Sequence, residues 1–593
     1  MVPEPDSEDD PKNKHESRLE FERQNRPDLP MFVTRTEWTE QDEEEFGRFV
    51  VRMGEAIAAK KCTTVRGCFQ SREANMYAHK DPKDVFFTSD CADFPYLLRA
   101  YFAYHNGLPF GHTALVRKNL EPVASVKDVD ASDPKYEIRY SPYGNSIVRR
   151  GFSTAGKKMG QEPNLIKYLT NMFNSVHTGT FRVSPLTPHY NLSDFYPVKI
   201  NRDGIKAGTI VHATGHVFVV WKVDERGRVH MIDANTQAGV SYKILQPSTL
   251  DFTRPDQALG FFRFRPLKLV GATKASNGAY YGGKVVGTTD EELFQQGKYS
   301  LEQWFGPDSN ISPGSKVEPD LWRKAFKGQT DFFEFVTNRL RDPNVVVAAN
   351  EIVSDMIDSL CEQFHQRLAD VKSTLSKGIH KLAHPSELPA DIFGQSDPTW
   401  GAYSTPNRDG RLKATVIDIV KESVRLFKLA KSGTDRSVRF DGSAEDYVKM
   451  LRNKVASANR SCSITYVNSA GKSVKLSFNQ LLARLTRMSF DPYHCAEKRW
   501  GASGNELATC VDTDRNNAWY EAQKYMRNTV GKMLPSGVNV IRSDRPITLT
   551  MLNDTSLIDQ PDSSPINLGA SRAPVLNLDA IFSSPQFLNQ LKQ

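Results

Sequence analysis

The segment 89–109 constrains the fold more than any other part of the chain, because it predicts a buried helix with a cysteine at its amino end. Ser89 and Asp90 are residue types that cap a helix, and Gly107 is typical of a helix end. Apolar side chains recur between them at helical spacing, at Phe94, Leu97, Leu98, Tyr101 and Phe102. Cys91 is therefore expected where the helix dipole and unpaired N–H groups stabilise a thiolate and can bind an oxyanion.

A thiolate nucleophile needs a base, and a later segment supplies a histidine on a predicted hairpin. Two β-rich runs flank Asp224-Glu225-Arg226-Gly227, a combination that favours a short connection between antiparallel strands. If Val223 pairs with Arg228, the alternation of side chains places His216 and Asp233 on one face of the hairpin.

The predicted register decides whether this histidine has an orienting partner. Asp233 lies diagonal to His216, at a backbone separation of roughly 7 Å that side chains can span. Asn235 lies directly opposite His216 in the same register. Either Asp233 or Asn235 would accept the imidazole N–H and hold the tautomer that takes the thiol proton. A slip of one residue would move Asp233 to the other face.

Cys91, His216 and Asp233, in this order and in these contexts, resemble the transglutaminase-like branch of the papain-like cysteine enzymes. In that family a Cys opens a helix that ends near Gly-Ile-Pro, a His begins a strand, and an Asp in the next strand is often followed by Pro-Thr. The corresponding segments here are Gly107-Leu108-Pro109 and Asp233-Ala234-Asn235-Thr236.

The NlpC/P60 amidases are a second relative by resemblance. Asp90-Cys91 and Gly215-His216-Val217 are similar to their Asp-Cys-Ser-Gly and Gly-His-Val, although the Ser-Gly after the Cys is missing here. The span from Cys91 to His216 is longer than either family needs, which implies an insertion at residues 111–208. A segment of this kind is expected to form a substrate-binding lobe or a lid.

The resemblance implies an α+β fold, with a papain-like or transglutaminase-like domain in which the helix carrying Cys91 packs on an antiparallel sheet. It implies a triad of Cys91, His216 and Asp233 that hydrolyses a peptide or isopeptide bond through a thioester. Gln70 is a candidate oxyanion-hole amide, the alternative being a polar loop residue. The other functions open at this point are an inactive scaffold or binding protein, a cell-wall peptide amidase of NlpC/P60 type, and a true transglutaminase. Fold does not choose among them.

Neither a metal nor an organic cofactor is expected. His212 and His216 form a His-x3-His pair, but no Cys pair or acidic cluster in the sequence completes a metal site beside them. Chemistry at a Cys-His-Asp triad needs no cofactor.

Composition limits the partners. The net charge of +7 is small for 593 residues and no Lys/Arg block stands out, so nucleic acid is not indicated. No apolar run is long enough to cross a bilayer. The expected partners are a protein or peptide substrate, with a cell-wall peptide as one form of it, and a protein partner for the helical C-terminal half.

The seven cysteines favour an oxidising compartment. Cys91 would keep its thiol while the other six form disulfides: Cys62, Cys68, Cys361, Cys462, Cys495 and Cys510. Cys62 and Cys68 would close a small loop, and Cys495 and Cys510 flank a Gly-containing loop. The first residues carry no secretory signal. The expected location is periplasmic or secreted, with a signal removed, and the alternative is cytoplasmic.

A chain of 593 residues is too long for one core and predicts two or three domains. The expected order is a disordered acidic lead at 1–36, the cysteine-enzyme domain at 37–275, a linker at 276–320, a mainly helical domain at 321–545 and an irregular tail at 546–593. Apolar periodicity predicts helices at 39–60, 164–174, 345–380, 412–429, 447–458 and 516–533, and turn residues predict a hairpin at 463–478.

Overall fold

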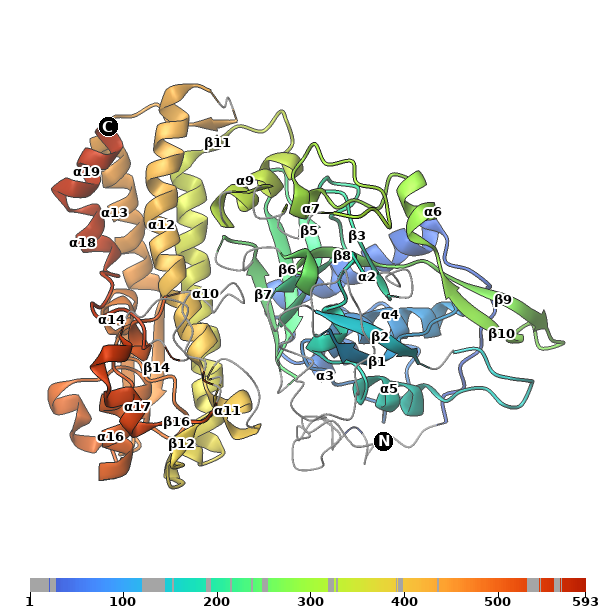
Figure 1. Cartoon of the computed structure of the whole chain (residues 1–593), viewed down its shortest axis with the longest axis horizontal. Coiled ribbons are helices and arrows are strands. Elements are labelled where there is room, and N and C mark those ends of the chain that lie inside the picture. The colour runs from blue at the N-terminus through green and yellow to red at the C-terminus, as the bar shows by residue number, and fades with distance from the viewer. Residues whose placement is uncertain are drawn as a thin grey trace. The chain divides into compact units, whose positions relative to one another are not determined.

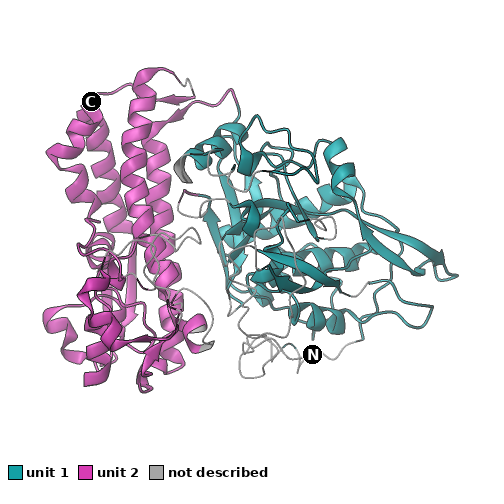
Figure 2. Cartoon of the chain, viewed as in Figure 1, with its two compact units in different colours: residues 1–245, 250–342 teal, residues 246–249, 343–593 magenta. Residues whose placement is uncertain are grey.

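The computed structural model describes residue 21 and residues 28–593 except 120–143, 152–153, 188–192, 214–215, 236–237, 248–253, 318–320, 322–324, 327–328, 391, 393–397, 435–436, 531–542, 544, 559–565 and 567. The chain is a mixed helix and sheet protein (Figure 1), as the predicted α+β class requires. It divides into two compact units, residues 1–245 with 250–342 and residues 246–249 with 343–593 (Figure 2). Among the described residues, no helix combines the length and apolar character that crossing a membrane would require.

A six-stranded antiparallel sheet forms the centre of the first unit. Its strands follow the spatial order β3-β8-β4-β5-β6-β7. Runs of β-branched and aromatic residues make β4, β5, β6 and β8 almost wholly buried, as expected for strands that are covered on both faces. The strands are β3 (Phe195–Pro197), β4 (Ile210–Ala213), β5 (His216–Val223), β6 (Val229–Ala234), β7 (Val240–Ile244) and β8 (Gly260–Phe264).

Two helices of this unit begin and end close to the residues that the sequence predicts. Thr39 caps α2 (Glu40–Ala58) in a capping box with Asp42, and α4 (Asp93–Asn106) ends at Gly107 in the left-handed conformation. The unit also contains α3 (Val65–Gln70), α5 (Leu165–Phe173) and the 3-10 helices η2 (Thr178–Phe181) and η4 (Pro255–Gln257).

The hairpin of β5 and β6 has the predicted register at its far end and a different one at its turn. Val223 pairs with Val229 instead of Arg228, because the Asp224 carboxylate holds a longer turn through the N–H of Arg228. A bulge between Val220 and Lys222 then shifts the pairing back by one residue. Val219 accordingly pairs with Ile232, which is the predicted partner.

The described residues between 111 and 208 form part of the core of the first unit, where we expected a separate substrate-binding lobe or a lid. This stretch includes β1 (Thr113–Lys118), β2 (Asn145–Arg150), α5 and β3, and it supplies buried side chains such as Leu169 and Met172. The apolar face of α5 explains this outcome, since an amphipathic helix of this kind needs a core to cover it.

The expected linker at 276–320 is wrong, because this stretch is folded into the first unit. Its Gly-rich part forms a strand paired with the preceding one, and Gly282 and Gly283 adopt positive φ there. Trp304 is fully buried and donates its indole N–H to the Leu259 carbonyl at 2.8 Å. The elements are β9 (Leu267–Lys274), β10 (Tyr280–Gly287), α6 (Asp290–Gln295) and α7 (Glu302–Phe305), followed by α9 (Gln329–Leu340).

The predicted lead at 1–36 lies largely outside the described residues. Residues 28–36 are described and are packed, with Leu29, Met31 and Val33 buried. The Leu29 carbonyl accepts the N–H of Leu165 at 2.9 Å. Phe21 is also described and is fully buried, so a disordered lead is wrong for the described residues of this stretch.

The second unit is mainly helical, as predicted, but starts at 343 instead of 321 because α9 belongs to the first unit. In this unit two long helices, α12 (Pro406–Ser432) and α13 (Ala444–Ser461), both pack on α10 (Ala349–Ser376) (Figure 1). The hairpin of β14 (Ser463–Val467) and β15 (Ser473–Ser477) lies where it was expected. Shorter elements complete the part before 545: β11 (Val347–Ala348), η5 (Ile379–Lys381), β12 (Glu387–Leu388), α11 (Pro398–Tyr403), β13 (Val438–Arg439), α14 (Phe478–Arg484), α15 (Ala496–Arg499), η6 (Gly504–Thr509), α16 (Asp514–Ala522) and η7 (Met526–Asn528).

The expected irregular tail at 546–593 is also wrong. It contains β16 (Ile547–Thr548), α17 (Leu549–Asn553), η8 (Thr555–Leu557), α18 (Leu578–Phe582) and α19 (Pro585–Lys592). Leu578, Phe582 and Phe587 are buried in the same core as α10 and α12. Each helix is too short to give a clear apolar period in the sequence, and packing on the long helices stabilises it.

Gly54 on α2 allows this helix to approach β5, and Gly54→Ala is expected to destabilise the first unit. A Cβ atom at this position would lie 2.2 Å from Cγ of Trp221, an atom close to the backbone that cannot move away cheaply. We expect a loss of about 2–3 kcal/mol from overpacking. Calorimetric unfolding would show it as a lower Tm.

Gly47→Ala is the matched control on the same helix. The new Cβ would lie 3.6 Å from the nearest atom, the Ala207 carbonyl oxygen, so it meets only ordinary contact. The gain in helix propensity should leave Tm unchanged or slightly higher. Equal losses in both variants would contradict the role given to the Trp221 contact.

Candidate active site

Cys91 lies in the turn immediately before α4 and is buried. The Asp90 carboxylate caps the helix, accepting the N–H of Ala92 at 2.8 Å and of Asp93 at 3.0 Å. The position of the thiol at the amino end of the helix is thus the predicted one. The amide of Ala92, a neighbour expected to bind an oxyanion, is used by Asp90 instead.

Helix α4 is fixed to the sheet through polar and aromatic side chains that follow Cys91. The Tyr96 hydroxyl donates to Asp194 Oδ2 at 2.7 Å, just before β3. The Tyr96 ring packs edge-on against Phe264 of β8. Arg99, one turn further along, forms ion pairs with Glu43 of α2. These contacts set the place of the Cys91 turn over the sheet.

His216 and Asp233 are brought together across β5 and β6, as the sequence predicts. His216 Nε2 lies 2.6 Å from Asp233 Oδ2, which fixes the ring and makes Nδ1 the nitrogen that faces any other partner. The imidazole is 18% exposed and the carboxylate is only 2% exposed. The ring also packs edge-on against Phe218, two residues along the strand.

Two residues of β7 that sequence reasoning missed complete the surroundings of Asp233. Lys243 Nζ lies 2.7 Å from Asp233 Oδ2, the same oxygen that accepts from His216. The Ser241 hydroxyl donates to Asp233 Oδ1. Ser241 pairs with Asp233 across the sheet, so a prediction that β7 follows β6 in antiparallel register would have found both residues.

Asp233 is held as a carboxylate. Burial by itself would raise the pKa of Asp233, but the positive charge of Lys243 and the hydrogen bond from His216 hold it well below its ordinary value of 3.8. A buried anion that accepts from the imidazole can orient the ring and stabilise an imidazolium.

Asn235, the alternative orienting residue, organises a turn. Its Oδ1 accepts the N–H of Gly239 at 2.8 Å, and the turn is held by backbone bonds from Val65 to Ala238 and from Val240 to Thr63. The hydrogen bond that orients the His216 ring goes to Asp233.

Gln70 does not fit the role of an oxyanion-hole amide. It is the last residue of α3, and its side chain is exposed. A donor that stabilises an oxyanion has to lie in a site that excludes water. Gln70 instead fits the alternative, a polar residue at the surface.

The disulfides are Cys62–Cys68, Cys361–Cys462 and Cys495–Cys510, and Cys91 keeps its thiol. Six paired cysteines and one thiol are what the sequence predicts. The small Cys62–Cys68 loop also carries Thr63 and Val65, which bind the turn after Asp233.

His212 takes no part in a metal pair with His216. It is fully buried, and its Nδ1 donates to the Ala258 carbonyl at 2.7 Å. His216 is bonded to Asp233.

Comparison of the chain with protein-family models, with curated proteins and with solved structures gives no match.

Lys243→Met tests the electrostatics of this site. The depressed pKa of Asp233 means that its ionised form stabilises the fold above pH 3.8 and that this contribution is lost as the pH falls. Removing the ammonium group, which is partly exposed, should cost about 1–2 kcal/mol at pH 7. The difference in Tm from the native protein should shrink as the pH is lowered through 3.8 and below.

Lys222→Met is the control, since the Lys222 side chain is exposed on β5 of the same sheet. It should leave Tm unchanged at both ends of the pH range. A Lys243 variant whose deficit did not depend on pH would mean that Lys243 acts through its cation–π contact with Phe218 and not through Asp233.

Proposed function

We propose that the chain is a cysteine-dependent hydrolase of a peptide or isopeptide bond, with a transglutaminase-like, papain-like arrangement of Cys91, His216 and Asp233. The observation that carries the proposal is the 2.6 Å bond between His216 Nε2 and the buried, ionised Asp233. Cys91 is a second support for the proposal. It keeps its thiol, and it lies at the amino end of a buried helix.

In the proposed reaction His216 Nδ1 takes the proton of the Cys91 thiol, and the sulfur attacks the amide carbonyl carbon. The carbonyl π electrons move to oxygen, and the resulting oxyanion needs N–H donors, of which the Cys91 amide would be one. When the C–N bond breaks, the imidazolium returns the proton to the leaving amine. This step leaves a thioester on Cys91.

Water then resolves the thioester, with His216 as the base and Asp233 stabilising the imidazolium at each stage. An amine in place of water would make the reaction an acyl transfer, as in a true transglutaminase. An acyl donor that is a cell-wall peptide would make it an NlpC/P60-type amidase. We favour hydrolysis because it needs no second substrate site.

One observation favours a second function, an inactive scaffold with the same fold. The Ala92 N–H, which would be a second oxyanion donor next to Cys91, is bonded to Asp90. A site with a single backbone donor would lose much of the stabilisation that an oxyanion hole supplies, about 3 kcal/mol for each donor.

The three disulfides support a periplasmic or secreted location, because thiols stay reduced in the cytosol. We propose that the substrate is a protein or peptide of that compartment, and that the second unit binds a protein partner. No cofactor takes part in the proposed reaction.

Alkylation of Cys91 by iodoacetamide across pH, with the site assigned by mass spectrometry, tests the proposal. We expect native Cys91 to react below pH 7, as a thiol does when a histidine takes its proton. His216→Ala should slow the reaction at pH 7 by about tenfold or more, because an unassisted thiol titrates near 8.5.

His105→Ala is the matched control. His105 also pairs with a carboxylate, Asp81, but lies at the other end of α4, about 20 Å along the helix from Cys91. Its loss should leave the alkylation profile unchanged. If His216→Ala also leaves the alkylation profile unchanged, the inactive scaffold would be the favoured function.

A further inference from the structure

The second unit contains a wholly buried group of two histidines and an aspartate that the sequence did not predict. His384, Asp491 and His494 are each at most 1% exposed. One potential ligand atom from each lies within 4.8 Å of the others. His384 follows η5, whereas Asp491 and His494 lie in the loop before α15, more than a hundred residues later.

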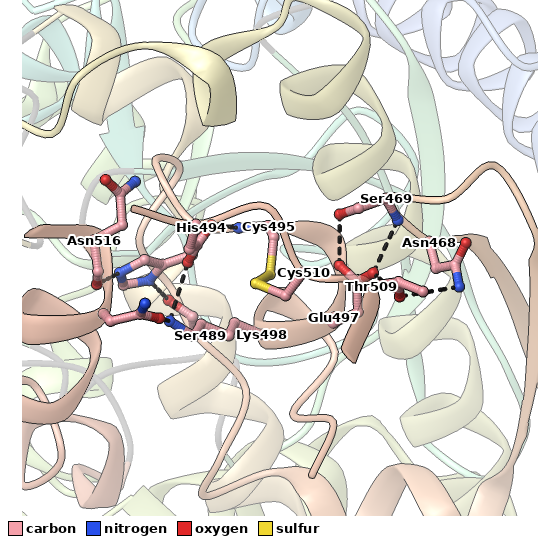
Figure 3. The surroundings of a disulfide bond; sticks show 12 residues. Asn468, Ser469, Ser489, His494, Cys495, Glu497, Lys498, Thr509, Cys510 and Asn516 are labelled. Atoms are coloured by element: carbon pink, nitrogen blue, oxygen red, sulfur yellow. Dashed lines mark hydrogen bonds and ion pairs between the residues drawn. A yellow bond between two sulfur atoms is a disulfide. The ribbon is translucent and has the colours of Figure 1, made fainter. Parts of the chain in front are cut away.

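Both imidazoles are oriented by backbone carbonyls on their outer side. His384 Nδ1 donates to the Pro385 carbonyl at 2.8 Å, and His494 Nε2 donates to the Asn516 carbonyl at 3.0 Å. Figure 3 shows His494 held between Asn516 and Ser489. This is how metal-bound histidines are fixed in one tautomer, with the second nitrogen directed at the ion.

The inward nitrogens therefore face the group. His384 Nε2 lies 2.9 Å from Asp491 Oδ2, and His494 Nδ1 lies 2.6 Å from the Ser489 hydroxyl. Because Nε2 of His494 is bonded to the Asn516 carbonyl, Nδ1 is the nitrogen that a metal would use, as in metal-bound histidines held by a backbone carbonyl.

His384 and Asp491 are directly juxtaposed: Nε2 of His384 lies 2.9 Å from Asp491 Oδ2, while Nδ1 is bonded to the Pro385 carbonyl. A divalent cation would bind between Nε2 and the carboxylate, since both are ligand types that zinc takes in proteins.

Two polar atoms beside the group have no hydrogen-bond partner although they are fully buried. The Gln523 side chain donates to Asp491 Oδ2 at 2.6 Å and leaves Oε1 unsatisfied. Trp519 stacks on His384 with the rings 4.6 Å apart, and its indole N–H is unsatisfied. Buried polar groups without partners in native proteins call for an explanation, such as an ion with its bound water.

We propose that His384 Nε2, Asp491 and His494 Nδ1 bind one Zn²⁺ ion, with a water or the Ser489 hydroxyl as the fourth ligand. Two imidazoles and a carboxylate suit zinc, whose tetrahedral ligands lie about 3.4 Å apart for bonds near 2.1 Å. Small shifts of the three side chains would reach that spacing. Lys498, whose charge acts on His494 and would repel such an ion, is itself paired with Asp512 at 3.1 Å.

The ion would be structural, because its ligands are closed off from solvent. It would join the segment after η5 to the loop before α15, and through Asn516 to α16. The Cys495–Cys510 disulfide, which directly follows His494, constrains the same loop (Figure 3). The other group with metal-ligand residue types, Cys495, Glu497 and Cys510, is excluded because both sulfurs are in this disulfide.

Elemental analysis of the full-length protein, grown with added Zn²⁺ and passed over a chelating resin, tests the proposal. We expect about one zinc per chain in the native protein and in His380→Gln, the control, whose histidine lies in the same unit outside the group. His384→Gln and Asp491→Asn should lose at least about nine-tenths of the metal, since each removes a ligand.

Cobalt substitution of the native protein gives a readout that does not depend on how the variants fold. Growth with Co²⁺ should give the visible bands of a four-coordinate ion without a thiolate charge-transfer band. No metal in the native protein would overturn the proposal and leave a buried hydrogen bond between His384 and Asp491. A thiolate band, or metal retained in both ligand variants, would also overturn it, because the ion would then lie elsewhere.

Discussion

The ion pairs of Glu43 hold together the elements on which the first unit depends. Glu43 on α2 accepts from Arg99 of α4 at 3.0 Å and from Arg263 of β8 at 3.2 Å, and all three side chains are buried. Burial alone would raise the pKa of Glu43, but the two guanidinium groups keep it below its ordinary value. Loss of Glu43 would leave two buried cations uncompensated, at a cost of about 3–5 kcal/mol. One carboxylate thereby fixes the Cys91 helix to both the sheet and α2.

Local sequence signals predicted the parts of this arrangement that depend on neighbouring residues. The cap at Asp90, the left-handed Gly107 and the capping box of α2 each rest on a few adjacent side chains. The pairing of His216 with Asp233 was also predicted, although the turn was wrong. The bulge after Val220 corrected the shift, so the hydrophobic face of the hairpin, which has to be buried, set the register.

Contacts that depend on strand pairing or on distant segments were not predicted in the same way. Lys243 and Ser241 lie ten and eight residues after Asp233, and finding them requires the antiparallel pairing of β7 with β6. The Gly-rich stretch at 278–287 has the composition of a linker and forms a strand, because pairing with β9 satisfies its backbone. His384 and Asp491 are 107 residues apart, and the fold alone brings them together.

Exposure separates two of the aspartate–histidine pairs among the described residues, His216–Asp233 and His384–Asp491, by what they can do. Asp233 and Asp491 each accept from an imidazole at 2.6 and 2.9 Å, so the local geometry is nearly the same. His216 is 18% exposed and can exchange a proton with a substrate group, as a base must. His384 is sealed in the interior, where a proton transfer would leave an uncompensated charge. The first pair is therefore suited to chemistry, and the second to holding a fixed charge, such as a metal ion, within the fold.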